Sequence, residues 1–388
     1  MLGHPRYRLR RALRRINRPA YDWWSDRYHF KWHHRPANPF RWTRIQPCRE
    51  RKVECGRAVI GNELFIFAGY HETLDQVSNL IEIYDLANER WKLPISFKAG
   101  LPHSHHGMDT DEKQFVYLAG GQIGPQASPC TAQVSVFDSQ SRTWASLPPL
   151  PEPRYDPVVG LLDGKLHVVA GAMPDRFAHA CEHWSLAVKD GRALEQEWRE
   201  EPSIPHGGHH RASAVIKDKL FTLGGQERDL RPISGDPKFT CDWNTPVEIM
   251  YRDVYSYCSR KQRWKSLAPL PLIETHAEFS VFPKGKYIVL LGGLESRTSL
   301  VAAIQVYDTE SDQWKVAGYL PYPLKGHVAS LYQDTVFVFA GQRSVSATDS
   351  RPGDVLRSGW KAKLPDLDAL FADNQDGGEG RLGALNSF

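Results

Sequence analysis

The sequence predicts an all-β protein, a β-propeller of six four-stranded sheets, and two repeated signatures carry this prediction. The first is an apolar strand that ends in glycine, which occurs six times. The second is an aromatic residue seven positions before a tryptophan, in phase with the first. A chain of 388 residues exceeds what one hydrophobic core usually serves, and radial modules that bury their faces against one another resolve this difficulty.

The glycine-ended strands recur roughly every fifty residues, which is the spacing expected of propeller blades. They occupy residues 64–69, 116–121, 167–171, 221–225, 289–293 and 336–341. Where a strand approaches its neighbours near a crowded axis, only a residue without a Cβ atom fits. We therefore expect these segments to be the second strands of six blades.

The aromatic signature predicts the outer half of each blade. Four pairs have this spacing: Tyr84 and Trp91, Phe137 and Trp144, Tyr257 and Trp264, and Tyr307 and Trp314. An outward strand would end on the aromatic residue, and the returning strand would bring its tryptophan against the neighbouring blade. The third blade is irregular, because Trp184 lies in its third strand and a charged turn leads to Trp198.

Ring closure is predicted from an unmatched strand at each end of the repeat region. The sixth module ends with a third strand at residues 359–364, and a spare strand at residues 40–45 precedes the first module. Pairing the two would convert two exposed sheet edges into one ladder. We expect this pairing to close a propeller domain that spans residues 40–365.

The termini are expected to lie outside the propeller. Residues 1–39 form a basic, aromatic arm with ten Lys or Arg against two Asp. This arm suits an organelle transit peptide, an RNA-binding arm, a helix on an anionic membrane surface or a solvated tail. Its aromatic part, residues 21–34, favours packing on the propeller or on a partner protein over nucleic acid. Residues 366–388 are rich in glycine and acid and predict a disordered tail.

The glycine and Tyr/Trp signatures resemble those of the kelch-repeat β-propellers of the galactose oxidase/kelch superfamily over residues 41–364. A closer resemblance is to a plant-type group of endomembrane kelch-repeat proteins. It rests on residues 104–108, 121–126, 153–155, 182–191, 210–212 and 224–227. The resemblance implies the Golgi, whereas the arm indicates an organelle or a larger assembly, so the localisation stays open. No run approaches the roughly 18 apolar residues of a membrane-spanning helix.

The candidate site lies on the face that carries the loops between blades and those between second and third strands. Eight of the twelve histidines after residue 39 fall in four segments that begin a blade. Counting back fifteen residues from the second glycine of each signature gives Glu54, His106, Asp156, His210, Glu278 and Gly326. The candidate ligand-binding residues of this mouth are Glu54, His105, His106, Gln122, Arg154, Tyr155, Asp156, His209, His210, Arg211, Gln226, His276, Glu278, His327 and Gln342.

Converging histidines and carboxylates could bind a first-row metal, perform acid–base chemistry, hydrogen-bond sugar hydroxyls or satisfy one another. No nucleophile elbow, phosphate loop or zinc-protease helix favours an enzyme. We therefore expect a non-catalytic binding or scaffold propeller without a cofactor, for a protein partner or a small polar ligand such as a glycan. The alternative is a carbohydrate-directed or metal-assisted enzyme that uses His106, Asp156, His210 and Glu278. The long insertion at residues 226–251 is a lid, a docking loop or an inert excursion.

Overall fold

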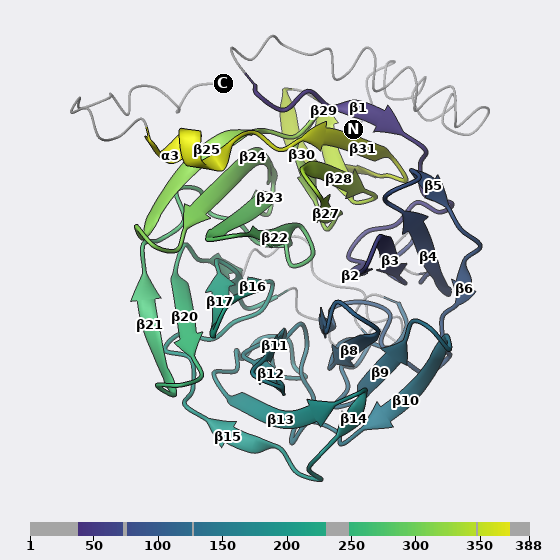
Figure 1. Cartoon of the computed structure of the whole chain (residues 1–388), viewed down its shortest axis with the longest axis vertical. Helices are drawn as coiled ribbons and strands as arrows, with labels where there is room; N and C mark the ends of the chain where they lie inside the picture. The colour runs from purple at the N-terminus through teal and green to yellow at the C-terminus, as the bar shows by residue number, and fades with distance from the viewer. Residues whose placement is uncertain (1–37, 73–75, 126–127, 230–247, 347, 373–388) are drawn as a thin grey trace, which may run out of the picture.

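Six antiparallel sheets surround one axis in a computed structural model that describes residues 38–72, 76–125, 128–229, 248–346 and 348–372 (Figure 1). The innermost strands contact one another in the order β2, β7, β11, β16, β22 and β27, and β27 contacts β2 again. The predicted radial arrangement is therefore confirmed. Among the described residues, no helix is long and apolar enough to cross a membrane.

The first three blades follow the predicted order of strands. Blade one contains β2 (Gly56–Ile60), β3 (Glu63–Phe67), β4 (Leu80–Asp85), β5 (Arg90–Trp91) and β6 (Ile95–Ser96). Blade two contains β7 (Gly107–Thr110), β8 (Phe115–Ala119), β9 (Val134–Asp138) and β10 (Thr143–Leu147). Blade three contains β11 (Val158–Leu162), β12 (Lys165–Val169), β13 (His183–Lys189), β14 (Arg192–Ala193) and β15 (Arg199–Glu201).

Blades four and six carry additional strands on the mouth face, and blade five has longer second and third strands. Blade four contains β16 (Ala212–Ile216), β17 (Lys219–Leu223), β20 (Val254–Cys258) and β21 (Arg263–Leu267), with the hairpin β18 (Gln226–Glu227) and β19 (Ile249–Met250). Blade five contains β22 (Val281–Lys284), β23 (Tyr287–Ser296), β24 (Ser299–Asp308) and β25 (Gln313–Tyr319). Blade six contains β27 (Val328–Tyr332), β28 (Thr335–Phe339), β31 (Gly359–Lys363) and β1 (Thr43–Ile45), with β26 (Leu324–Lys325), β29 (Gln342–Ser346) and β30 (Asp349–Val355) in a separate small sheet.

The chain closes the ring as the sequence predicts. Strand β1 pairs antiparallel with β31, so that Arg44 lies opposite Trp360. Phe40 is buried, and the indole N–H of Trp42 donates to the Tyr319 carbonyl at 2.8 Å. The segment before β1 therefore joins blade five to blade six, and the rest of the arm, residues 1–37, lies outside the described residues.

The glycines and tryptophans act as the repeat signatures predict. Gly121 has φ +92°, and a Cβ atom there would lie 2.6 Å from the His106 Cβ. The indole N–H of Trp264 donates to the Pro202 carbonyl at 2.8 Å, and that of Trp314 donates to the Ala268 carbonyl at 2.9 Å. Each of these two tryptophans thus fastens its blade to the backbone that leads out of the preceding blade.

The predicted disordered tail is wrong at its beginning. Residues Leu367–Ala372 form helix α3, with Leu367 buried and Leu370 and Phe371 packed against the core of blades five and six. Tyr287 donates its hydroxyl to an Asp368 carboxylate oxygen at 2.6 Å. The prediction used the acidic composition of the whole tail. The packing of the aliphatic and aromatic side chains in this short segment orders it despite that composition. Residues 373–388 lie outside the described residues.

Removing β1 should destabilise the propeller. A chain that starts at residue 47 loses the β1–β31 ladder and the burial of Phe40, which alone contributes about 2 kcal/mol. We expect a lower free energy of unfolding in a denaturant titration followed by tryptophan fluorescence. A chain that starts at residue 38 keeps β1 and is the matched control. Equal stability of the two truncated chains would contradict the proposed closure.

Candidate functional site

Six residues at the start of the blades form a ring around the axis, which we call the axial ring: Glu54, His105, Asp156, His210, His276 and Gly326. All six have left-handed backbone angles, with φ between 49° and 57°. Backbone hydrogen bonds link successive members, from Asp156 N–H to the His105 carbonyl at 2.7 Å and from Gly326 N–H to the His276 carbonyl at 2.8 Å. Non-glycine residues seldom adopt this conformation, and such strain concentrates at functional sites.

The axial ring corrects two of the six positions obtained by counting back fifteen residues. In blade two the hairpin between β7 and β8 is one residue longer than the hairpin of blade one, so His105 rather than His106 occupies the ring. In blade five a turn from Ala277 to Ser280 precedes β22, so His276 rather than Glu278 occupies it. These local insertions change the number of residues between the ring position and the second glycine. A fixed count of fifteen residues therefore misses the ring position in these two blades.

His210 lies between two carboxylates beneath the mouth. Its Nδ1 atom is 2.9 Å from Asp156 Oδ2 and 2.5 Å from Glu278 Oε1. Burial opposes the charge of the imidazolium, but the two carboxylates raise the pKa of His210 well above its ordinary value. The His276 ring stacks on His210 with 3.7 Å between centroids, and burial together with the His210 charge keeps the pKa of His276 well below the ordinary value. A cationic imidazole is therefore held against a neutral one.

His105, another member of the axial ring, lies between Glu54 and Tyr155. His105 Nε2 lies 2.9 Å from Glu54 Oε2, and Lys325 Nζ lies 3.5 Å from the other oxygen of Glu54. Burial opposes ionisation of this carboxyl, but the neighbouring His105 and Lys325 lower the pKa of Glu54. The Tyr155 ring stacks on His105 with centroids 4.5 Å apart.

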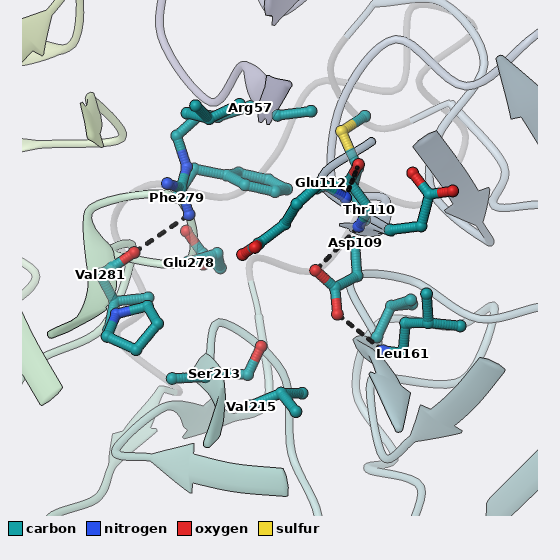
Figure 2. A pocket seen from close by; sticks show the side chains of 17 residues that line it. Arg57, Asp109, Thr110, Glu112, Leu161, Ser213, Val215, Glu278, Phe279 and Val281 are labelled. Carbon is teal, nitrogen blue, oxygen red and sulfur yellow. Dashed lines mark hydrogen bonds between the residues drawn. The ribbon is translucent and has the colours of Figure 1, made fainter. Parts of the chain in front are cut away.

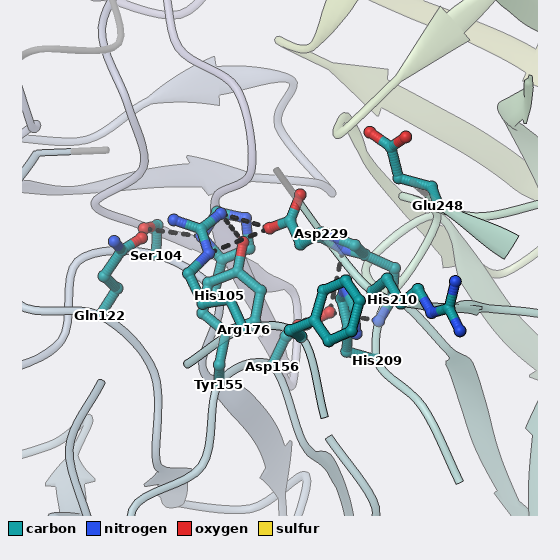
Figure 3. A network of polar contacts seen from close by, with 12 residues as sticks. Ser104, His105, Gln122, Tyr155, Asp156, Arg176, His209, His210, Asp229 and Glu248 are labelled. Atoms are coloured by element: carbon teal, nitrogen blue, oxygen red, sulfur yellow. Dashed lines mark hydrogen bonds and ion pairs between the residues drawn. The ribbon is translucent and has the colours of Figure 1, made fainter. Parts of the chain in front are cut away.

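Arg176 covers the outer face of Tyr155 and joins it to Asp229 (Figure 3). Its Nη2 atom donates to the Tyr155 hydroxyl at 2.8 Å, and its Nε atom donates to Asp229 Oδ2 at 3.1 Å. The guanidinium lies 4.3 Å from the centroid of the Tyr155 ring. Burial opposes ionisation of Asp229, but Arg176 holds the pKa of this carboxyl well below its ordinary range.

Above the axial ring lies a cavity of about 400 Å³. Glu54, His105, His210 and His276 line it from the ring, and the strand pairs of blades four, five and six contribute further lining residues. Ligand pockets in proteins typically occupy about 300–1,000 Å³. This mouth cavity therefore has the size of a site for one small molecule.

A second cavity of about 350 Å³ lies among the innermost strands (Figure 2). Glu278 lines it, so the Glu278–His210 contact stands between the two cavities. Asp109 accepts the Leu161 N–H at 2.6 Å, and Arg57 Nη2 donates to the Val281 carbonyl at 3.1 Å. The charged groups of this inner cavity thus hydrogen-bond the backbone of other blades.

The structure separates several predicted site residues from the mouth. Arg154 pairs with Glu152 and Glu182 and packs on Trp184, and Arg211 pairs with Asp253. Each of these two arginines thus pairs with the carboxylate that directly precedes the third strand of its own blade. Three predicted histidines are buried and do not line the mouth cavity: His106, His209 and His327.

The three predicted glutamines differ in their roles. Gln122 accepts the Tyr70 hydroxyl and donates to the Ser128 carbonyl at 2.6 Å, so its amide orders the loop after β8. Gln226 and Gln342 line the mouth cavity, as predicted for residues that follow the glycine signatures. The middle of the 226–251 insertion, residues 230–247, lies outside the described residues.

Sequence reasoning missed several lining residues, among them Tyr70, Arg176, Asp229 and Lys325. Tyr70 follows Gly69 at the position that Gln122 takes in blade two, so the repeat could have revealed it. Arg176 and Asp229 come from loops between second and third strands that have no common length. Their meeting depends on how the loops fold, and no spacing in the sequence indicates it.

His327 provides a test of how burial affects histidine in this fold. Neither of its ring nitrogens has a hydrogen-bond partner among the described residues, and burial lowers its pKa to about 3. As the pH falls from 6.5 to about 5, the unfolded chain binds a proton that the folded chain excludes, so the stability falls by about 2 kcal/mol. Denaturant titrations at both pH values measure this loss of stability. In His327→Leu, we expect the part of the loss that arises from His327 to disappear. A variant that loses stability as steeply as the wild type would contradict the assignment.

Comparison with known proteins agrees with the fold. No protein-family model matches the chain. The chain is 35% identical over 335 residues to the Kelch repeat-containing protein At3g27220 of Arabidopsis thaliana, which covers 85% of this chain and 77% of that protein. It is 21% identical over 326 residues to the Kelch-like protein terF of Aspergillus terreus, and the match covers 80% of this chain and 66% of that protein. The solved structure of YjhT shares the fold alone, with a TM-score of 0.60 and 13% identity over 81% of this chain and 95% of YjhT. These likenesses and the six-sheet ring show that the chain belongs to the kelch-repeat family.

Proposed function

We propose that this protein is a non-catalytic binding propeller whose mouth cavity takes a small polar ligand. The observation that supports it most directly is the axial ring, in which five ionisable residues have left-handed backbones and four of them, Glu54, His105, His210 and His276, line the mouth cavity. Five such residues cost folding free energy, and a protein keeps strain of this kind where it serves a site. The ring brings together side chains from five blades that are distant in the sequence.

A small ligand suits the geometry better than a protein partner does. The ring side chains that line the cavity are almost fully buried, with His210 2% and His105 7% exposed. A folded protein surface would contact the rim formed by β18–β19 and β29–β30 without reaching them. A partner protein that binds this rim or the N-terminal arm remains compatible with a small ligand below it.

One observation supports the alternative of an enzyme. Ligand atoms of Asp156, His210 and Glu278 lie within 4.8 Å of one another, a set of donors that suits a divalent metal or proton transfer. However, His210 already bridges both carboxylates, and Glu278 lines the inner cavity rather than the mouth. His106, the fourth residue of this alternative, lies outside the cluster. The contacts of these residues therefore favour a binding protein over an enzyme.

Equilibrium dialysis tests the proposed function. The purified full chain is dialysed against a defined panel of neutral sugars, sugar acids, sugar phosphates, amino acids and nucleosides, and retained compounds are measured by mass spectrometry. We expect at least one compound to be retained by the wild type and lost in Tyr155→Ala, because this change removes the ring that stacks on His105 and the hydroxyl that accepts from Arg176. Thermal unfolding of the variant checks that it is folded. Retention of no compound by the wild type would overturn the proposal.

Metal binding distinguishes the alternative, a metal-assisted enzyme, from the proposed binding protein. Titrating the full chain with zinc or manganese by calorimetry, with His210→Gln as the comparison, measures whether the donor cluster holds an ion. We expect the wild type and the variant to give the same signal, because His210 is engaged as a cation between two carboxylates. Stoichiometric binding that His210→Gln abolishes would favour the metal-assisted enzyme over the binding protein.

A further inference from the structure

Two buried polar atoms of the mouth cavity have no hydrogen-bond partner among the described residues. They are Arg176 Nη1 and Gln226 Oε1, and both residues line the cavity. Arg176 is 5% exposed and Gln226 is 1% exposed, so bulk water reaches neither side chain freely. A buried donor or acceptor left unsatisfied costs about 1–3 kcal/mol. The cavity therefore offers one strong donor and one acceptor to a ligand.

The position of Arg176 is determined by its other contacts. Asp229 and the Tyr155 hydroxyl engage its Nε and Nη2 atoms, and the Tyr155 ring supports the guanidinium plane. Within the part of the chain that the structure describes, the Nη1 side of the fork has no hydrogen-bond partner. Gln226 is held in a similar way, since its Nε2 atom donates to the Arg228 carbonyl at 3.3 Å while no described residue donates to Oε1. Both groups are thus oriented before a ligand arrives.

The charges of the cavity argue against an anionic ligand. Each cationic side chain that lines it lies beside a carboxylate of its own: Arg176 beside Asp229, Lys325 beside Glu54, Arg297 beside Glu248, Arg351 beside Asp349, and His210 beside Asp156 and Glu278. Among the described lining residues, an incoming carboxylate or phosphate would therefore find no uncompensated positive charge. It would also approach the carboxylates of Asp229 and Glu54, which costs free energy in a buried site.

The aromatic side chains argue against a flat ligand that binds by stacking. One face of Tyr155 is covered by the His105 ring and the guanidinium of Arg176 also packs against Tyr155. Tyr70 directs its hydroxyl to Gln122, and its ring is tilted by 55° against His105. A nucleobase would therefore find these rings already engaged.

We infer that the mouth binds an uncharged, hydroxyl-rich compound, a sugar or a sugar alcohol. One hydroxyl oxygen of the ligand accepts a hydrogen bond from Arg176 Nη1, and one ligand hydroxyl donates to Gln226 Oε1. A hydroxyl group both donates and accepts, so hydroxyls can satisfy both atoms without bringing a charge. This inference rests on the proposed function and names the chemical class of its ligand.

Calorimetry with the full chain tests the inference. The neutral probes are D-galactose, L-arabinose and myo-inositol, the anionic probes are D-glucuronate and glucose 6-phosphate, and adenosine is the flat probe. We expect at least one neutral probe to bind. Its affinity should change little when salt is raised from about 0.05 M to about 0.5 M, because an uncharged ligand forms no ion pair with the protein that salt could screen. Binding by an anionic probe alone, weakened by salt, would overturn the inference and leave the proposed function standing.

Two variants locate the binding. Arg176→Lys keeps a positive charge beside Asp229 but removes the Nη1 donor, and Gln226→Met removes the acceptor at similar volume. We expect each to weaken binding of the neutral probe by about tenfold or more, which is the effect of losing one hydrogen bond in a buried site. Arg211→Lys is the matched control, because Arg211 is equally buried but pairs with Asp253 outside the cavity.

The outcomes separate the two proposals. If the neutral probe binds all three variants equally, the assignment to Arg176 and Gln226 is wrong. If the wider dialysis panel contains no retained compound, the proposed function itself fails. Unfolding temperatures of the three variants identify a loss of binding that arises from misfolding, and Gln226→Met keeps the test valid if Arg176→Lys does not fold.

Discussion

The left-handed turn by which each blade begins at the axis is the constraint on which the site depends. In this turn the chain leaves one blade, reverses near the axis and starts the innermost strand of the next blade. The residue at the turn has positive φ in all six blades, and successive turns are hydrogen-bonded to each other at several steps. This backbone arrangement directs one side chain from each of the first five blades toward a common centre. The sixth blade supplies Gly326, where a Cβ atom would lie 2.6 Å from a methyl group of Val53.

Compensation of charge explains how so many ionisable groups can share one small volume. Burial alone would neutralise the carboxylates and the imidazoles, since a charge in a medium of low polarity is costly. In this mouth each carboxylate of the ring lies beside a cation, as in Glu54 with Lys325 and Asp156 with His210. Buried ion pairs of this type contribute little net stability, but the loss of one partner is costly. The pairs therefore hold the side chains in place more than they stabilise the fold.

The stability of the propeller arises elsewhere, in the apolar packing between blades and in the closure of the ring. Tyr84 and Trp91 of blade one pack against Phe339 of blade six, with ring centroids 4.8 Å and 5.2 Å away. Aromatic contacts of this kind contribute beyond the area that they bury. Because the outer parts of the blades supply this packing, the mouth can tolerate left-handed backbones, neutral buried histidines and polar atoms without partners.

The sequence by itself determined the number of blades, the tryptophan positions and the closing strand, because these depend on a repeated local pattern and on hydrophobic periodicity. It also placed Glu54, Asp156 and His210 correctly at the axis. Only the tertiary structure decided that His105 and His276, rather than His106 and Glu278, belong to the axial ring, since one longer hairpin and one extra turn shift the register. The meeting of Arg176 with Tyr155 and Asp229 was likewise decided by loops of unequal length, whose contacts depend on three-dimensional packing and not on spacing along the chain.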